Sequence, residues 1–126
     1  MKSLSAEEFL ETRDISTFTS ASVLGALPEE SILWLLERGK IRAMDEGEYL
    51  FAPGESGNSF HVILQGGVSY YKYHLGKYAF IRDYDRGEQI GFMSLIALHD
   101  RVGRAACHAD TIALEIDSTV FHAFHD

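Results

Sequence analysis

The stretch Ile90-Gly91-Phe92-Met93-Ser94-Leu95-Ile96, followed by Asp100-Arg101, decides the fold of this chain. A glycine such as Gly91 lets the backbone come close to a bound phosphate, because it has no side chain. The residues after it can begin a short helix whose first N–H groups point at an anion. Arg101 can then neutralise a phosphodiester and bind it with two hydrogen bonds. These residue types together are suited to binding a phosphate, and residues 90 to 101 are called the cassette below.

Several other segments occur in a specific order and spacing along the chain. They are Leu27-Pro28-Glu29-Glu30, Gly47-Glu48-Tyr49-Leu50-Phe51, Pro53-Gly54-Glu55-Ser56-Gly57-Asn58-Ser59-Phe60, Val62-Ile63-Leu64-Gln65-Gly66-Gly67-Val68, Arg86-Gly87-Glu88-Gln89-Ile90-Gly91 and Ala109-Asp110-Thr111-Ile112-Ala113-Leu114-Glu115-Ile116-Asp117. Together with the cassette they resemble the cyclic-nucleotide-binding sensor domain of the cAMP receptor protein/FNR regulator superfamily. The resemblance implies a mainly β fold with flanking helices, an antiparallel β-roll of the double-stranded β-helix or jelly-roll type.

The resemblance also supplies a predicted ligand site with two departures from the family pattern. Its residues are Gly91, Phe92, Met93, Ser94, Arg101 and Val102. The family has a Glu where Phe92 stands, to accept a hydrogen bond from the ribose, and usually a Ser or Thr where Val102 stands, to bind phosphate. Losing two such hydrogen bonds weakens binding by about 3 kcal/mol, or about a hundredfold. We therefore expect weak or altered binding of cyclic nucleotides.

The cassette leaves three interpretations open. Arg104 begins a rival Arg-x-Ala match and is an alternative anion-binding residue, although that alignment needs three inserted residues and we favour Arg101. Arg101 either binds an anion or forms a structural salt bridge with Asp100 or Glu88. Phe92 either leaves the site without a carboxylate for the ribose, or presents an aromatic face that excludes ribose and contacts an apolar or planar ligand.

Composition limits the class of protein. A chain of 126 residues can bury one core, and its net charge of −8 argues against nucleic acid as a direct partner. A small anionic ligand remains compatible with that charge if positive charge is local. The single cysteine, Cys107, excludes an internal disulfide, and we interpret it as a small buried residue. No apolar run resembles a membrane span or a signal peptide, so we expect a cytoplasmic protein without membrane contact.

The predicted elements run from helix to sheet to helix. A capping box from Ser5 to Glu8 predicts a short first helix, and residues 12 to 21 are predicted to connect it to a helix between Pro28 and Gly39. Frequent glycines then predict one antiparallel roll over residues 41 to 116, interrupted by a cassette helix at 91 to 98. Residues 74 to 77 are the expected tip of a hairpin, and Ser118 is the expected cap of a final helix. The predicted division is residues 1 to 22 for the first helix and connection, and 23 to 126 for the binding domain.

Two other groups of side chains could carry a function. One is an aromatic set expected to stabilise the hairpin across its strands, with an exposed tyrosine surface for a partner as the alternative. Its members are Tyr70, Tyr71, Tyr73, Tyr78, Phe80 and Tyr84. The other is the pair His122 and His125, which we expect to be solvated rather than metal-bound, because no third ligand has a clear spacing. His61 lacks the second histidine of a cupin metal site, so we assign no metal.

The leading hypothesis is a ligand-sensing regulatory module, in which binding tightens the cassette and moves the terminal helix. The alternative is a ligand-free roll used as a homodimerisation or protein-docking domain. An enzyme of cupin type is not expected, since no nucleophile–base pair or metal triad is evident. The candidate ligands are a cyclic nucleotide or another small anion, and no cofactor is assigned. The long dimerisation helix and the helix-turn-helix of the regulators are not expected in this chain, so DNA binding is not assigned to it.

Overall fold

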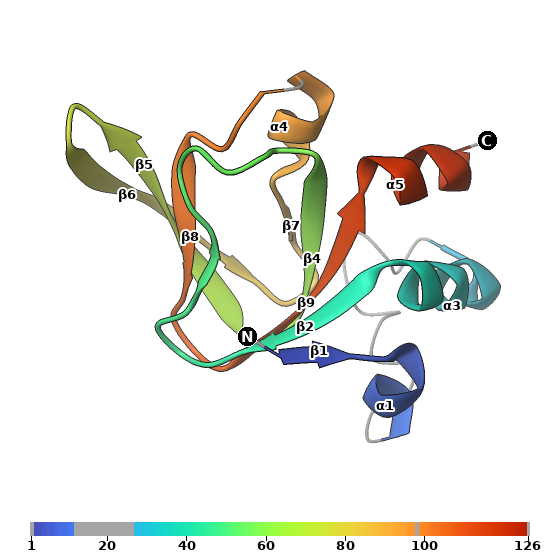
Figure 1. Ribbon diagram of the computed structural model, residues 1–126. Coiled ribbons are helices and arrows are strands. Elements are labelled where there is room, and N and C mark those ends of the chain that lie inside the picture. Colours follow the sequence, from blue (N-terminus) through green and yellow to red (C-terminus); the bar gives the residue numbers. More distant parts are fainter. Residues whose placement is uncertain (1, 12–26, 98, 126) are drawn as a thin grey trace.

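The structure, a computed structural model, describes residues 2–11, 27–97 and 99–125. Two antiparallel sheets form a roll (Figure 1). The first sheet has the strand order β1 (Lys2–Leu4), β2 (Lys40–Met44), β9 (Thr111–Asp117), β4 (Ser59–Gln65) and β7 (Gln89–Ile90). The second has the order β3 (Tyr49–Phe51), β8 (Gly103–Cys107), β5 (Gly67–His74) and β6 (Lys77–Asp85). The prediction of an antiparallel roll over residues 41 to 116 is confirmed.

Four helices are described alongside the strands. They are α1 (Ala6–Glu11), α3 (Glu29–Arg38), α4 (Phe92–Ala97) and α5 (Ser118–His125). Figure 1 shows α1, α3 and α5 on one side of the roll, with α4 inserted between β7 and β8 at another corner. In the described residues, none of the helices combines the length and the apolar character that crossing a membrane requires.

The start of α1 has the predicted capping box. Glu8 N donates to Ser5 Oγ at 3.0 Å, and Ser5 N donates to Glu8 Oε1 at 3.2 Å. Helix α3 begins one residue after Pro28 and ends at Arg38, with Gly39 as its C-cap, close to the predicted bounds. Strand β1, which pairs with β2, was not predicted. The predicted connection at residues 12 to 21 and the domain boundary after residue 22 lie outside the described residues.

The five-stranded sheet is buried on both faces, which produces two apolar clusters. Val62 and Ile63 are consecutive in β4 and both are fully buried, because successive side chains of a strand point to opposite faces. Ile63 lies inside the roll, with Val68 and Ile90. Val62 belongs to the cluster that α3 and α5 cover, where the ring of Trp34 lies 5.8 Å from that of Phe124. The helices therefore pack on the same sheet that forms one wall of the roll.

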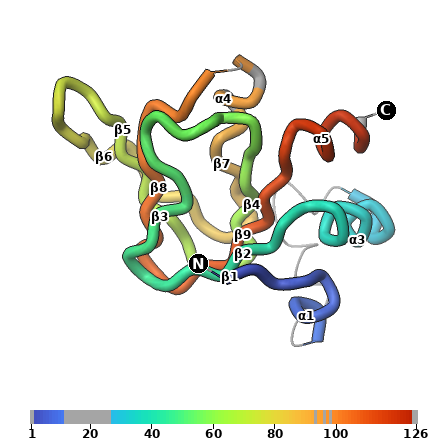
Figure 2. Tube along the Cα trace, in the orientation of Figure 1, coloured from blue at the N-terminus to red at the C-terminus, as the bar shows by residue number. Residues whose placement is uncertain are grey.

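The predicted hairpin is confirmed. Leu75 and Gly76 connect β5 to β6, with φ angles of 50° and 79°. Two consecutive positive φ angles are typical of a type I′ turn, whose twist matches that of the strands. Figure 2 shows that this hairpin projects beyond the rest of the roll.

The cap of α5 differs from the prediction by one residue. Strand β9 continues to Asp117, whose Oδ1 accepts a hydrogen bond from Val120 N at 2.9 Å. Ser118, the predicted cap, is already helical, and its own N–H donates to Asn58 O at 2.8 Å. The prediction was wrong because Asp117 and Ser118 both suit a cap by type, and the end of the strand decides between them.

We expect Asp117→Ala to lower the free energy of unfolding by about 1 kcal/mol, since the N–H of Val120 loses its acceptor. Ser118→Ala is the neighbouring control, with an expected change of about 0.5 kcal/mol or less. Urea denaturation of both variants measures the difference. A larger loss for Ser118→Ala would contradict the assignment of the cap.

Candidate functional site

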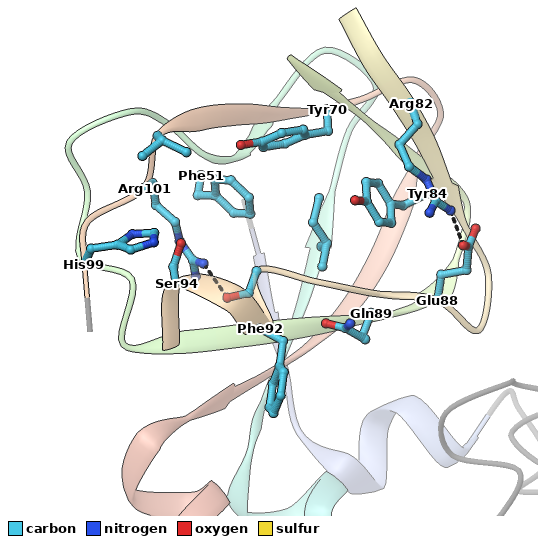
Figure 3. Close-up of a pocket in the computed structure, with 13 residues that line it drawn as sticks. Phe51, Tyr70, Arg82, Tyr84, Glu88, Gln89, Phe92, Ser94, His99 and Arg101 are labelled. Atoms are coloured by element: carbon cyan, nitrogen blue, oxygen red, sulfur yellow. Dashed lines mark hydrogen bonds and ion pairs between the residues drawn. The ribbon is translucent and has the colours of Figure 1, made fainter. Parts of the chain in front are cut away.

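One end of the roll contains a cavity of about 540 Å³. A cavity of this volume is typical of sites for small molecules. Figure 3 shows the residues that line it. They are Phe51, Tyr70, Arg82, Tyr84, Glu88, Gln89, Ile90, Gly91, Phe92, Ser94, His99, Arg101 and Val102. The predicted site residues Gly91, Phe92, Ser94, Arg101 and Val102 are among them, so the fold brings the two ends of the cassette together.

The backbone of the cassette requires two glycines. Gly91 has a φ of +95°, which non-glycine residues rarely adopt, and α4 begins directly after it. A Cβ placed on Gly91 would lie 2.5 Å from Arg101 Nη1. Gly57, in the loop before β4, approaches the cassette so closely that a Cβ there would clash with His99 O and Ser94 Cβ. This close contact holds the loop against the cassette.

Arg101 is buried at the centre of the site. Its Nη1 donates to Gly91 O at 3.0 Å and its Nη2 donates to Ser59 O at 2.6 Å. The guanidinium carbon lies 4.3 Å from the centre of the Phe51 ring. Although the residue is only 4% exposed, no partner is found for Nε among the described residues. Burial lowers the pKa of Arg101, and the negative charges of Glu115 and Glu55 oppose that effect.

The predicted structural salt bridge of Arg101 with Asp100 or Glu88 is not formed in the described residues. Glu88 instead accepts a hydrogen bond from Arg82. The main chain of Arg101 is also fixed, since its N–H donates to Glu55 O at 2.8 Å and its carbonyl accepts from Gly54 N at 2.9 Å. The guanidinium thus donates to two backbone carbonyls, and within the described ranges no carboxylate forms an ion pair with it.

A partly buried polar network lies behind Arg101. Ser59 Oγ donates to Glu115 Oε2 at 2.9 Å, and Arg42 Nε donates to Glu115 Oε1 at 2.9 Å. Burial lowers the pKa of His61 to about 4, so His61 is neutral at pH 7 although its Nε2 lies 3.8 Å from Glu115 Oε2. For Glu115, burial raises the pKa, but the effects of His61, Ser59 and Arg42 outweigh it and the net pKa is lowered. Glu115 is therefore the charged carboxylate that Ser59 connects to Arg101.

Phe92 does not present its ring to the cavity. Figure 3 shows the ring on the far side of the cassette backbone. It lies 5.2 Å from the ring of Phe60 and 5.4 Å from that of Phe121, in edge-to-face arrangements. In this position the ring packs in the apolar cluster beneath α5. That its aromatic face contacts a ligand stays a prediction. Through its contact with Phe121, Phe92 packs α4 against α5.

Arg104 points away from the cavity and does not line it. Its guanidinium lies 3.9 Å from the ring centre of Tyr78, 5.0 Å from that of Tyr71 and 5.2 Å from that of Tyr49. Its Nη1 donates to Tyr49 Oη at 3.2 Å. These contacts favour a structural cation–π role over the alternative anion site.

Two aromatic residues of the cavity wall were not predicted as part of the site. Tyr84 and Tyr70 line it, with Arg82 4.1 Å from the ring centre of Tyr84. Burial raises the pKa of the Tyr70 hydroxyl, with Tyr84 adding to the effect. Alternation along β5 was the available signal, since Val68 and Tyr70 share the inner face of that strand. No cluster of three or more His, Cys, Asp or Glu side chains suited to a metal occurs in the parts of the chain that the structure describes.

Comparison with known proteins shows the family of this chain. The sequence profile of the cyclic nucleotide-binding domain matches residues 41–126. The chain belongs to this family. A search of curated proteins found no match. That Phe92 stands at the position of the family's acid, and Gly91 and Arg101 at those of its glycine and arginine, remains a prediction from the sequence.

Solved structures share the fold of this cyclic nucleotide-binding domain. A cyclic nucleotide-binding-like protein from Brucella abortus is 21% identical, with a TM-score of 0.69 and coverage of 89% of this chain and 97% of that one. The regulatory subunit of a cAMP-independent protein kinase A from Trypanosoma cruzi, bound to guanosine, is 22% identical (TM-score 0.77; 94% and 42% covered). The catabolite activator protein of Thermus thermophilus is 28% identical (TM-score 0.70; 79% and 47% covered). The chain spans less than half of the last two proteins.

Proposed function

We propose that this domain is a ligand-sensing regulatory module whose cavity binds a small anionic ligand at Arg101. The observation that supports it most directly is a buried guanidinium inside the roll, beside the first residues of α4, with Nε unpaired among the described residues. A buried cation attracts an anion more strongly than an exposed one. Arg82, the other cation of the cavity, already has Glu88 as its partner. The anionic group therefore binds at the Arg101 end.

Cyclic nucleotides are expected to bind weakly. The side chain at position 92 lies outside the cavity, so no carboxylate meets the ribose there, and Val102 offers no hydroxyl to the phosphate. An anion must also compete with Gly91 O and Ser59 O for the guanidinium N–H groups. The Trypanosoma cruzi regulatory subunit is bound to guanosine, which has no phosphate, and this supports including nucleosides among the ligands tested.

The proposed response to ligand runs through the loop before β4. Ser59 O accepts from Arg101, and the preceding residue, Asn58, accepts from the first N–H of α5. A ligand that draws Arg101 away from Ser59 would shift this loop and with it the start of α5. The movement of a terminal helix is a form of output that needs no enzymatic activity, and we propose none. A cytoplasmic location remains a prediction from the sequence.

The test is thermal stabilisation by a panel of cAMP, cGMP, guanosine and inorganic phosphate, followed by calorimetry. We expect cAMP and cGMP to have dissociation constants weaker than about 1 μM. For any phosphate-bearing ligand that stabilises the domain, Arg101→Ala should abolish the stabilisation, because it removes the cation of the cavity. Arg101→Lys keeps the positive charge but loses the planar guanidinium, which can donate two parallel hydrogen bonds. This variant should therefore retain only part of the thermal stabilisation by ligand.

Arg104→Ala is the control, since Arg104 lies outside the cavity and its loss should leave binding unchanged. If folded Arg101→Ala protein bound the same ligand equally well, the proposed site would be wrong. The alternative, a ligand-free roll for docking or dimerisation, would be preferred if the wild-type domain bound none of these compounds. Arg101 would in that case be a structural cation held by carbonyls.

A further inference from the structure

The inner face of strand β8 continues into the end of the cassette. Arg101, Gly103 and Ala105 are buried, whereas Val102 between the first two is 50% exposed. Because successive side chains of an extended chain point to opposite faces, Arg101 and Gly103 share the face that lies inside the roll. Residues two positions apart in an extended chain lie about 7 Å apart. A side chain that packs on Gly103 therefore lies beside Arg101.

The side chain that packs on Gly103 is Tyr70, from strand β5. A Cβ placed on Gly103 would lie 2.5 Å from Tyr70 Oη and 2.6 Å from Tyr70 Cζ. It would also lie 2.4 Å from Tyr71 O, so the neighbouring backbone is equally close. A side chain at position 103 would thus occupy the place of the Tyr70 hydroxyl. The glycine allows this hydroxyl to lie against the first residue of β8.

Phe51 connects Tyr70 to Arg101 from the other side. The ring of Tyr70 lies 6.3 Å from that of Phe51, and the guanidinium carbon of Arg101 lies 4.3 Å from the centre of the same ring. All three side chains line the cavity. Figure 3 shows the Tyr70 hydroxyl directed towards the Arg101 end of the cavity, away from Tyr84 and Arg82. The hydroxyl and the guanidinium therefore belong to the same end of the site.

The Tyr70 hydroxyl is available as a hydrogen-bond donor. No partner for its Oη occurs within the residues that the structure describes. Burial raises the pKa of Tyr70, and Tyr84 adds to the effect, so the hydroxyl keeps its proton at neutral pH. A neutral phenol donates to an anion, and such charge-assisted hydrogen bonds are stronger than those between neutral groups.

An anion at Arg101 needs a donor beyond the guanidinium. Two of the guanidinium nitrogens already donate to Gly91 O and Ser59 O, and Val102 has no hydroxyl. Oxygens of a bound anion that are left without donors in a partly buried site weaken binding. Tyr70 is placed to provide such a donor from a different strand.

We propose that the Tyr70 hydroxyl binds the ligand directly, by donating a hydrogen bond to a phosphate group held at Arg101. This inference rests on the proposed function and adds the chemical class of the anion. A phosphate presents oxygens in several directions, so one can accept from Arg101 while another accepts from Tyr70. The phosphate group of a nucleotide and inorganic phosphate share this chemistry.

Tyr70→Phe tests the inference, because it removes the hydroxyl and keeps the ring between Phe51 and Gly103. Thermal stabilisation and calorimetry are carried out with inorganic phosphate, cAMP and guanosine at constant ionic strength. The dissociation constants of phosphate and cAMP should rise about tenfold, as expected for the loss of one hydrogen bond to a charged group. Guanosine has no phosphate, so its dissociation constant should change by about twofold or less.

Tyr71→Phe is the matched control for the loss of a tyrosine hydroxyl. Tyr71 follows Tyr70 in β5, but its ring packs 5.7 Å from that of Phe80 and it does not line the cavity. This variant should leave all the dissociation constants unchanged. If Tyr71→Phe weakened phosphate binding as much as Tyr70→Phe, the effect would not come from a contact with the anion, and the inference would be wrong.

Comparison with Arg101→Ala separates this inference from the proposed function. If folded Tyr70→Phe bound phosphate and cAMP as tightly as the wild type while Arg101→Ala abolished binding, the role of Tyr70 would be wrong and the site at Arg101 would stand. If Arg101→Ala also bound them normally, both would be wrong. An equal loss of affinity for guanosine and cAMP would assign Tyr70 to the nucleoside part of the ligand and overturn the inference.

A second pair of variants tests the position of the ring without any ligand. Gly103→Ala should lower the temperature of thermal unfolding, because the new methyl group meets both Tyr70 and Tyr71 O. In a Tyr70→Val background the same substitution should cost less, since only the contact with the backbone remains. Equal losses in the two backgrounds would show that the Tyr70 ring does not lie on Gly103, and would overturn the geometry on which the inference depends.

Discussion

Gly91→Ala is expected to lower the free energy of unfolding by about 3 kcal/mol. Two effects contribute. A φ of +95° costs a residue with a side chain about 1–2 kcal/mol. The new Cβ would also lie 2.5 Å from Arg101 Nη1, and forcing such a group into a packed site costs about 1–3 kcal/mol. Because the clash displaces the guanidinium, the variant should also lose ligand binding at Arg101.

Gly47→Ala is the matched control for this prediction. Gly47 has nearly the same φ, +93°, but a Cβ there would meet no atom within 4 Å. It should lose only the conformational part, about 1–2 kcal/mol. Urea denaturation of the two variants isolates the contact with Arg101 as the difference between them. Equal losses of unfolding free energy in the two variants would show that contact with Arg101 adds nothing to the cost of substituting Gly91.

Acidification is expected to destabilise the domain by about 3 kcal/mol between pH 6.5 and pH 4, through His61. Burial holds the pKa of folded His61 at about 4, against an ordinary value of 6.5. Between these two pH values the unfolded chain binds a proton that the folded chain excludes. The stability that this histidine contributes is therefore fully present above pH 6.5 and is lost as the pH falls towards 4.

Denaturation curves at pH 7.5, 5.5 and 4.5 measure this loss. His61→Gln is the informative variant, because it keeps a polar side chain but does not titrate. For each protein, the change in the free energy of unfolding is measured relative to its value at pH 7.5. This change should be much smaller for His61→Gln than for the wild type. If the variant lost as much stability as the wild type, the effect would come from Glu115, whose lowered pKa acts in the same direction but at lower pH.

The fold was predicted correctly at positions where the backbone conformation restricts which residue types can occur. Glycines at positive φ, such as Gly91, and the turn at Gly76 are needed whatever surrounds them. Their order along the chain therefore identified the roll, the hairpin and the cassette. The capping box at Ser5 is equally local, since its two hydrogen bonds join residues three positions apart.

The direction of side chains in the site was harder to predict, because it depends on residues distant in sequence. Arg101 is bound by a carbonyl 42 residues away, at Ser59, rather than by a nearby acid. Phe92 turns towards Phe121, which follows it by almost thirty residues and closes the apolar cluster. Tyr70 was recognised as aromatic but not as a wall of the cavity. In each case a tertiary neighbour decided between two orientations that the local sequence allowed.

The contact between Trp34 and Phe124 has an experimental use. Trp34 is the only tryptophan of the chain, and its ring lies against α5, 5.8 Å from the ring of Phe124. The tryptophan fluorescence of the domain therefore originates at the contact between α3 and the terminal helix, far along the chain from the cassette. Emission from the unlabelled protein would report a displacement of α5 during a ligand titration, and stopped-flow detection would give its rate.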